Sequence, residues 1–191
     1  MRKTIRKWFW VWDFDKEERW LNEMAARGLA LVNTGWCRYD FEDCTPGEYS
    51  IRLELLKEKP SHPESVKYME FLEETGAEHV GSNMSWVYLR KKTADGEFQL
   101  FSDNDSRVRH LTRIIQLVGA VTGVNLYIGF YNLFLLCFWG SGANLLGLIN
   151  LALALLGLYG VYKLGRKRKM LKEEQIVFEC SNQKGPAARM Q

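Results

Sequence analysis

The sequence predicts an α+β soluble domain, built as a ferredoxin-like split βαβ repeat, followed by a hairpin of two transmembrane helices. Three observations lead to this fold class. Residues 114–162 contain no Asp, Glu, Lys or Arg, although these four types make up 26% of the chain. Before that block, aromatic and β-branched stretches alternate with short amphipathic segments that end at glycine. This alternation occurs twice, with a spacing of 48 residues.

The first expected element is a strand over residues 5–12, rich in aromatic and β-branched side chains. Its tryptophans share one face at a period of two: Trp8, Trp10 and Trp12. We expect that face to pack as core beneath the helices. The opposite face, with Phe9 and Val11, is then the side of the sheet that the helices leave uncovered.

A helix of about three turns is expected next. Asp15 and Glu18 have the spacing of a capping box, and Gly28 supplies the stop. Two β-rich stretches follow, at residues 29–41 and 48–56. The first half of the domain is therefore predicted as strand, helix, strand.

The second half repeats this order. Ser61 and Glu64 form a capping box around Pro63, Gly76 ends the helix, and residues 78–90 are β-rich. A shift of 48 residues aligns five pairs: Trp20 with Tyr68, Leu21 with Met69, Met24 with Leu72, Gly28 with Gly76, and Val32 with Val80. Two such halves predict a four-stranded antiparallel sheet with both helices on one face. A further short strand is expected at residues 98–101.

The uncharged block divides at the Gly-Ser-Gly sequence of residues 140–142. About 20 apolar residues cross a bilayer, so the two parts, about 114–139 and 143–164, are each long enough to span it. Basic residues precede the first part and follow the second. By the positive-inside rule we expect a two-pass protein of the plasma membrane with both termini in the cytoplasm.

The charge distribution supports this division. Residues 1–113 hold 18 basic and 20 acidic side chains, whereas residues 163–191 hold 8 and 3, which gives the chain a net charge of +3. That balance excludes an acidic tail protein and a uniformly basic nucleic-acid binder. We predict a soluble domain at 1–110, a helical hairpin at 111–164 and a basic, partly disordered tail at 165–191.

Basic residues after the second span are expected to bind anionic lipid headgroups rather than nucleic acid, because they lie directly against the membrane. These residues are Lys163, Arg166, Lys167, Arg168, Lys169 and Lys172.

Five residues within the spans are candidates for contacts between helices. Gly119 and Gly123 form a pair of small residues four apart, Asn125 and Asn132 share one helix face, and Asn150 lies in the middle of the second span. Hydrogen bonds between these amides would hold the hairpin together or join two hairpins in a homodimer.

The most suggestive polar cluster consists of Asp103, Asn104, Asp105 and Ser106. Clustered carboxylates can hold Mg²⁺ or Ca²⁺, but the other ligands of a calcium loop are absent from the sequence. We favour a capping role, in which Asp105 or Ser106 begins the helix that enters the membrane. No phosphate-binding loop or nucleophile elbow is present, so we expect no catalytic residue, no metal and no cofactor.

Three segments carry a resemblance to a known family: KWFWVWDFDKEERWLNEMAARGLAL, FLEETGAEHVGSNMSWVYLRKK, and LFSDNDSR followed by two spans. They resemble the domain of unknown function 2812 family, bacterial membrane proteins mostly from Gram-positive lineages. Members of that family are often encoded near PadR-like transcription regulators, which implies a regulatory setting. The family defines no catalytic residue that the resemblance could carry over.

Three functions follow from these observations. The first is a non-catalytic regulatory or sensory membrane protein whose cytoplasmic domain binds a ligand or a protein, such as a transporter or a regulator. The second is an accessory subunit of an envelope or export complex that acts through the hairpin. The third is an enzyme acting on a membrane-associated substrate, with the carboxylates at 103 and 105 as its acid or metal site.

Overall fold

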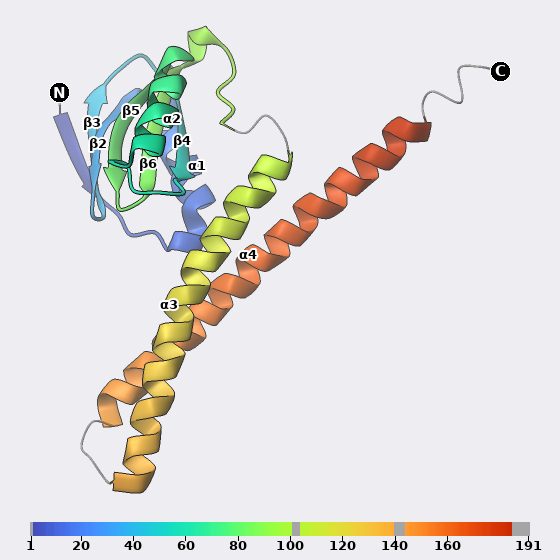
Figure 1. Cartoon of the computed structure of the whole chain (residues 1–191). Coiled ribbons are helices and arrows are strands. Elements are labelled where there is room, and N and C mark those ends of the chain that lie inside the picture. The colour runs from blue at the N-terminus through green and yellow to red at the C-terminus, as the bar shows by residue number, and fades with distance from the viewer. Residues whose placement is uncertain (1, 101–103, 140–143, 185–191) are drawn as a thin grey trace. The chain divides into compact units, whose positions relative to one another are not determined.

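Each half of the N-terminal domain folds as strand, helix, strand, strand (Figure 1). The first half contains β1 (Arg2–Arg6), α1 (Phe14–Ala26), β2 (Leu29–Gly35) and β3 (Arg38–Asp43). The second half contains β4 (Tyr49–Leu55), α2 (Pro63–Glu74), β5 (Ala77–Asn83) and β6 (Trp86–Lys92). Two short 3₁₀ helices, η1 (Val11–Asp13) and η2 (Thr93–Asp95), precede α1 and follow β6. This computed structural model describes residues 2–100, 104–139 and 144–184.

The α+β class is confirmed, but the sheets differ from the ferredoxin-like prediction. In place of one four-stranded sheet there are two antiparallel three-stranded sheets, ordered β1-β3-β2 and β4-β6-β5. The reason is that each long β-rich stretch turns back on itself as a hairpin. Cys37 and Met84 adopt left-handed backbone conformations in the two turns, with φ of 54° and 56°.

The two helices contact opposite faces of β6, which also departs from the prediction of both helices on one face. Tyr88 belongs to the core cluster of α1, whereas its neighbours Val87 and Leu89 belong to the cluster of α2. Successive side chains of a strand point to opposite faces, so one strand separates the two clusters. The α1 cluster also contains Phe41 of β3 and Ile51 of β4, and α1 therefore packs against residues from both sheets.

The sheets meet along β2 and β5, which lie side by side. A Cβ placed on Gly81 of β5 would lie 2.9 Å from Cγ2 of Thr34 in β2. Arg90 of β6 is the pairing partner of Glu78 in β5 and donates a hydrogen bond to the carbonyl of Leu31 at 2.9 Å. Leu31 of β2 therefore lies near Glu78 of β5. These two contacts show that β2 and β5 run in the same direction, so the hairpin turns that follow them lie at the same end of the domain.

The start of the chain corrects the prediction for the tryptophans. The first strand ends at Arg6, before the tryptophans, and the chain then leaves the sheet. Trp8 and Trp10 are exposed, while Trp12 is buried and stacks on Trp10 with ring centroids 5.0 Å apart. Phe9, expected on the uncovered face, packs instead against the α1 cluster. Period-two reasoning fails here because these residues are not in a strand.

The predicted capping residues are also displaced. α1 begins at Phe14, and Glu18 is used by β4 rather than by the helix N-terminus. At α2 the capping residue is His62, whose Nδ1 accepts a hydrogen bond from the backbone N–H of Glu64 at 3.3 Å. The strand expected at 98–101 is not formed by residues 98–100, and residue 101 lies outside the described part.

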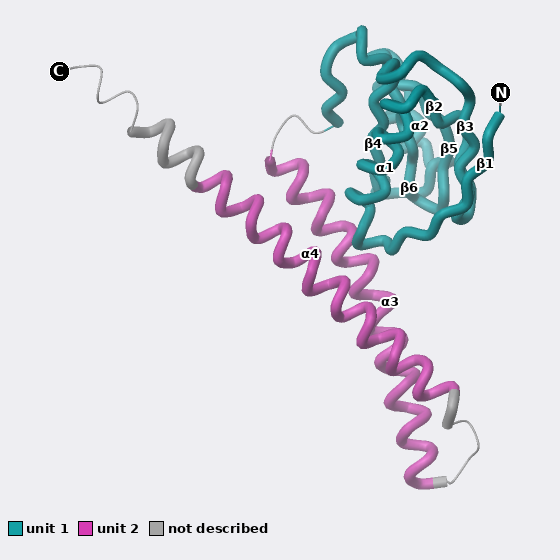
Figure 2. Tube along the Cα trace, turned by 180° about the vertical axis from the view of Figure 1, so that it is seen from behind, with its two compact units in different colours: residues 1–102 teal, residues 103–191 magenta. Residues whose placement is uncertain are grey.

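The second unit of the chain consists of α3 (Asn104–Trp139) and α4 (Asn144–Lys184), which pack against each other (Figure 2). Both helices are long and apolar enough to cross a membrane, as predicted. α4 continues as a helix through the basic segment to Lys184, including residues 165–184 of the expected tail. The break predicted at 140–142 lies outside the described residues.

Candidate functional site

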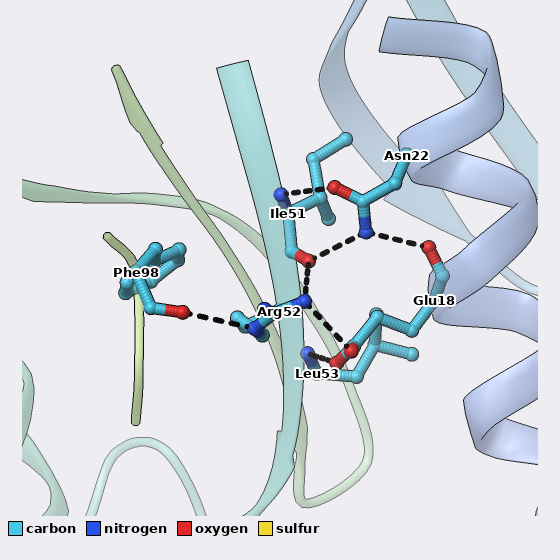
Figure 3. Close-up of polar contacts among 6 residues, drawn as sticks. All are labelled: Glu18, Asn22, Ile51, Arg52, Leu53 and Phe98. Carbon is cyan, nitrogen blue, oxygen red and sulfur yellow. Dashed lines mark hydrogen bonds and ion pairs between the residues drawn. The ribbon is translucent and has the colours of Figure 1, made fainter. Parts of the chain in front are cut away.

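The polar side chains of α1 are directed at the outer edge of β4 (Figure 3). Asn22 donates a hydrogen bond from Nδ2 to the carbonyl of Ile51 and accepts one at Oδ1 from the N–H of Ile51, both at 2.9 Å. Two residues further along β4, the N–H of Leu53 donates a hydrogen bond to Oε2 of Glu18 at 3.0 Å. These side chains satisfy strand groups that have no neighbouring strand, because β4 is the edge of its sheet.

Arg52 extends this network away from the helix. It forms an ion pair with Glu18 at 3.0 Å and donates from Nε to the carbonyl of Phe98, also at 3.0 Å. Burial raises the pKa of Glu18, opposed by the N–H of Leu53 and the charge of Arg52. The network therefore fixes both α1 and the segment after η2 on β4.

A second carboxylate, Glu17, is buried at the centre of the domain. Its Oε1 accepts hydrogen bonds from the hydroxyls of Tyr39 at 2.7 Å and Tyr88 at 2.6 Å. Tyr39 comes from β3 and Tyr88 from β6, so one oxygen links α1 to both sheets. Burial raises the pKa of Glu17, and the two hydroxyls lower it by a smaller amount. The pKa values of both tyrosines are raised, chiefly by burial and secondly by the nearby charge of Glu17.

Asp40 of β3 is another buried carboxylate. It accepts hydrogen bonds from Thr4 at 2.6 Å and Asn33 at 3.1 Å, and two from Arg38. These partners lower the pKa of Asp40 to about 2, with the hydroxyl of Thr4 as the largest contribution. Its position joins β1, β2 and β3, which makes it a structural group of the first sheet.

An open hollow lies at the end of the domain where β5 begins and β6 ends. It has a volume of about 530 Å³ and both acidic and basic lining residues. The lining consists of Glu73, Gly76, Ala77, Glu78, His79, Lys92 and Asp95. Glu78 is paired with Arg90 at 2.7 Å, and the ring of His79 lies 2.8 Å from the hydroxyl of Ser82. Such a surface suits a polar ligand or a polar segment of another protein.

The opposite end carries exposed apolar side chains, and we call it the tip end: residues 7–12, 36–38 and 84–86. Trp8 contacts Trp10 and Trp36, with ring centroids 5.5 and 6.1 Å apart. The three tryptophans thus form a continuous surface. Met84, in the other hairpin turn, is 82% exposed.

The polar cluster predicted at the start of the first span is only partly described. Asp103 lies outside the described residues, and Asn104 is the first residue of α3. Asp105 accepts a hydrogen bond from Gln175 of α4 at 3.1 Å, and Ser106 accepts one from Arg109 at 2.6 Å. Asp105 thus lies in the first turn of α3, where a carboxylate is favourable. In the described part of the chain, no group of three His, Cys, Asp or Glu side chains could hold a metal ion.

Contacts within the helix pair involve glycines other than the predicted ones. Gly129 packs against Leu151, and Gly147 packs against Asn132. By contrast, a Cβ on Gly119 or Gly123 would meet nothing within 4 Å.

The three predicted amides, at 125, 132 and 150, bond to carbonyls of their own helices, each at 2.8 Å. Contacts of Gly119 and Gly123 with the helices of a second copy remain a prediction.

The basic residues predicted to bind headgroups all lie on α4. Lys169 forms an ion pair with Glu173 one turn later, at 3.7 Å. These side chains follow the apolar part of the helix directly, as expected for a membrane boundary. Their binding to lipid remains a prediction.

Several notable features were not found from the sequence. Glu17 lies 22 residues from Tyr39 and 71 from Tyr88, so nothing local indicates that they meet. The polar hollow likewise depends on bringing α2, β5 and η2 together. The tryptophans were visible in the sequence, but their exposure depends on where β1 ends.

The fold and these surfaces define a class of protein: an α+β domain joined to a pair of helices that are long and apolar enough to cross a membrane. Residues 13–122 match the family described as "Protein of unknown function (DUF2812)", and the chain belongs to that family. The match covers the domain from η1 onward and reaches into α3. No curated protein and no solved structure matches the chain.

Proposed function

We propose that the chain is a non-catalytic regulatory or sensory protein of the plasma membrane. The helix pair anchors it, and the soluble domain binds a ligand or a protein partner. Basic residues flank the uncharged segment on both sides, which favours cytoplasmic locations for the domain and for both termini.

The observation that carries this proposal is the structural use of the buried and partly buried carboxylates. Glu17 joins α1 to both sheets, Glu18 holds the edge of β4, and Asp40 joins three strands. A fourth, Glu54, accepts a hydrogen bond from Tyr68 of α2 at 2.7 Å. Groups that work inside the fold in this way support a binding role for the domain rather than acid–base chemistry.

The hollow is the surface where we place the ligand or partner. Lys92 and His79 offer donors there, and Glu73 and Asp95 offer acceptors. The hollow is open to solvent and is formed by the ends of several elements. Its polar lining supports recognition of a charged small molecule or a polar protein segment.

The test is to cross-link the full-length protein in its own cells, purify it in mild detergent and identify what accompanies it. The variant Lys92→Glu reverses one charge of the hollow, and Lys67→Glu makes the same change on an exposed position of α2 outside it. A partner retained with Lys67→Glu and lost with Lys92→Glu is the expected result. Equal recovery with both variants would move the binding surface elsewhere, and recovery of the protein alone would contradict a protein partner.

A second candidate function is an accessory subunit of a membrane complex, and the free glycine face of α3 favours it. Gly119 and Gly123 face open space in the helix pair, so another helix could approach closely there. The substitution Gly123→Leu would block that approach. Loss of a membrane partner with Gly123→Leu, but not with Lys92→Glu, would support this second function.

A further inference from the structure

The tip end combines exposed aromatic side chains with basic ones. Trp8 is 54%, Trp10 41% and Trp36 70% exposed, and Met84 is 82% exposed. Large apolar side chains gathered in this way on a folded domain mark an interaction surface. The three segments of the tip end, 7–12, 36–38 and 84–86, contain Lys7 and Arg38 but no Asp or Glu. Arg38 is paired with Asp40 of β3, so Lys7 is the basic residue of these segments that carries the attraction to anionic lipid.

This composition fits the interfacial region of a lipid bilayer. Tryptophan is enriched at the level of the headgroups because its ring is apolar and its indole N–H is polar. Lysine and arginine beside it are attracted to anionic headgroups. Lys7 lies over the rings of Phe9 and Trp20, 4.9 and 4.5 Å from their centroids, so a cation borders the aromatic surface.

The last described segment of the domain lies beside β4. At the end of β6 opposite the tip end, the N–H of Thr93 donates a hydrogen bond to the carbonyl of Glu48. The chain then doubles back, and the carbonyl of Phe98 accepts a hydrogen bond from Arg52, in the middle of β4. β4 runs toward the tip end, where Leu55 pairs with Trp86, so Phe98 lies between the two ends of the domain.

The tether is short. Leu100 packs against the α2 cluster, and α3 begins at Asn104, ten residues before the uncharged segment. Ten helical residues extend about 15 Å, and four extended residues about 14 Å. Leu100 is therefore held within about 30 Å of the bilayer surface, and a weak lipid-binding surface on the domain acts at high effective concentration.

We propose that the tip end is a membrane-docking surface, in which Trp8, Trp10, Trp36 and Met84 enter the interfacial region of the bilayer that anchors the chain. Docking leaves the polar hollow, at the other end of the domain, facing the aqueous phase. The inference does not depend on what binds in the hollow, because the two surfaces share no residue.

The experiment uses the full chain in nanodiscs of phosphatidylcholine and phosphatidylglycerol. Its four cysteines are replaced, and an environment-sensitive fluorophore is attached through Met84→Cys in one sample and Asp95→Cys in another. Residue 84 is at the tip end, and residue 95 is at the opposite end. Lipids with nitroxide groups on their acyl chains then serve as quenchers.

We expect emission at residue 84 to shift to shorter wavelength and to be strongly quenched by the nitroxide lipids, while emission at residue 95 is unaffected. The double variant Trp8→Ser, Trp36→Ser should lose most of the quenching at residue 84. The matched change Phe71→Ser removes an aromatic side chain that is 58% exposed on α2, and it should leave the quenching intact.

Three outcomes would overturn the proposal. A shift at residue 84 without quenching would mean that protein covers the tip end, from a second copy or from the chain's own helices. Absence of both the shift and the quenching would mean that the tip end stays in water. Quenching that persists in the double tryptophan variant would mean that these aromatic side chains do not hold the domain on the membrane.

Discussion

The side chain of Asn22 hydrogen-bonds both backbone groups of Ile51, with two distances of 2.9 Å. It thus makes the pair of bonds that a residue in a neighbouring strand would make. An edge strand with unpaired groups is a site for unwanted pairing with other chains. The helix that packs on β4 also closes its edge, and this explains why polar residues stand on the inner side of α1.

Asn22→Ala should destabilise the domain by about 1–3 kcal/mol, because it removes the partner of the Ile51 N–H at a partly buried position. The carbonyl of Ile51 keeps only the longer bond from Nη1 of Arg52, at 3.5 Å. The measurement is urea unfolding of the full chain in detergent, followed by tryptophan fluorescence. Glu23→Ala, at the next and exposed position of the helix, is the control and should change stability little. Equal effects of the two substitutions would show that the bonds to Ile51 add nothing.

The unfolding free energy of the Glu17→Gln variant should increase relative to that of wild type as the pH rises. Both tyrosine hydroxyls donate to Oε1 of Glu17, which the amide oxygen of glutamine can replace. The pKa of Glu17 is raised in the folded state, so the folded state binds more protons than the unfolded state above the ordinary pKa. Stability contributed by protonated Glu17 is therefore present at low pH and is lost as the pH rises through the raised pKa.

The measurement compares unfolding free energies of wild type and Glu17→Gln from about pH 4 to about pH 8, a range that begins near the ordinary pKa of a glutamate and extends above it. The advantage of the variant should grow across this range. Glu23→Gln, on the exposed face of α1, serves as control. A difference between wild type and Glu17→Gln that stays constant with pH would contradict a raised pKa at Glu17.

The order of elements could be predicted because it depends on local patterns. Gly28 and Gly76 end the two helices with φ of 82° and 86°, a conformation for which glycine is the usual residue. The 48-residue repeat follows from these stops and from the apolar stripes between them. Two uncharged segments of sufficient length likewise predicted the helix pair.

The hairpins and the sheet arrangement could not be predicted in the same way. The left-handed turn positions are occupied by Cys37 and Met84, whereas Asn-Gly or Asp-Gly would have been the recognisable signal. When the turns are not recognised, the hairpins β2–β3 and β5–β6 are each predicted as one long strand. Four strands are then expected where the structure has six. The candidate surfaces depend on that arrangement, because both the tip end and the hollow combine residues from distant parts of the chain.

Gly81→Ala should destabilise the domain by about 1–3 kcal/mol, because the added methyl group overpacks the junction of the two sheets. It would lie 2.9 Å from Cγ2 and 3.3 Å from the backbone nitrogen of Thr34. Gly35→Ala is the matched control, since a Cβ there meets nothing within 4 Å. Thermal unfolding of the full chain in nanodiscs measures both. If Gly81→Ala is as stable as Gly35→Ala, β2 and β5 are not in close contact.

Gly147→Ala should weaken the pairing of α3 with α4. A Cβ at residue 147 would lie 2.8 Å from Cβ of Asn132, an atom that cannot move away without its helix. In Gly119→Ala the new methyl group meets nothing within 4 Å, and alanine favours the helix by about 1 kcal/mol over glycine. Titration with sodium dodecyl sulfate in mixed micelles, with fluorescent labels on the two helices, measures the loss of pairing. Gly147→Ala should lose pairing at a lower detergent fraction than wild type, and Gly119→Ala should not. The reverse order would show that α3 uses its Gly119 face, rather than its Asn132 face, to contact α4.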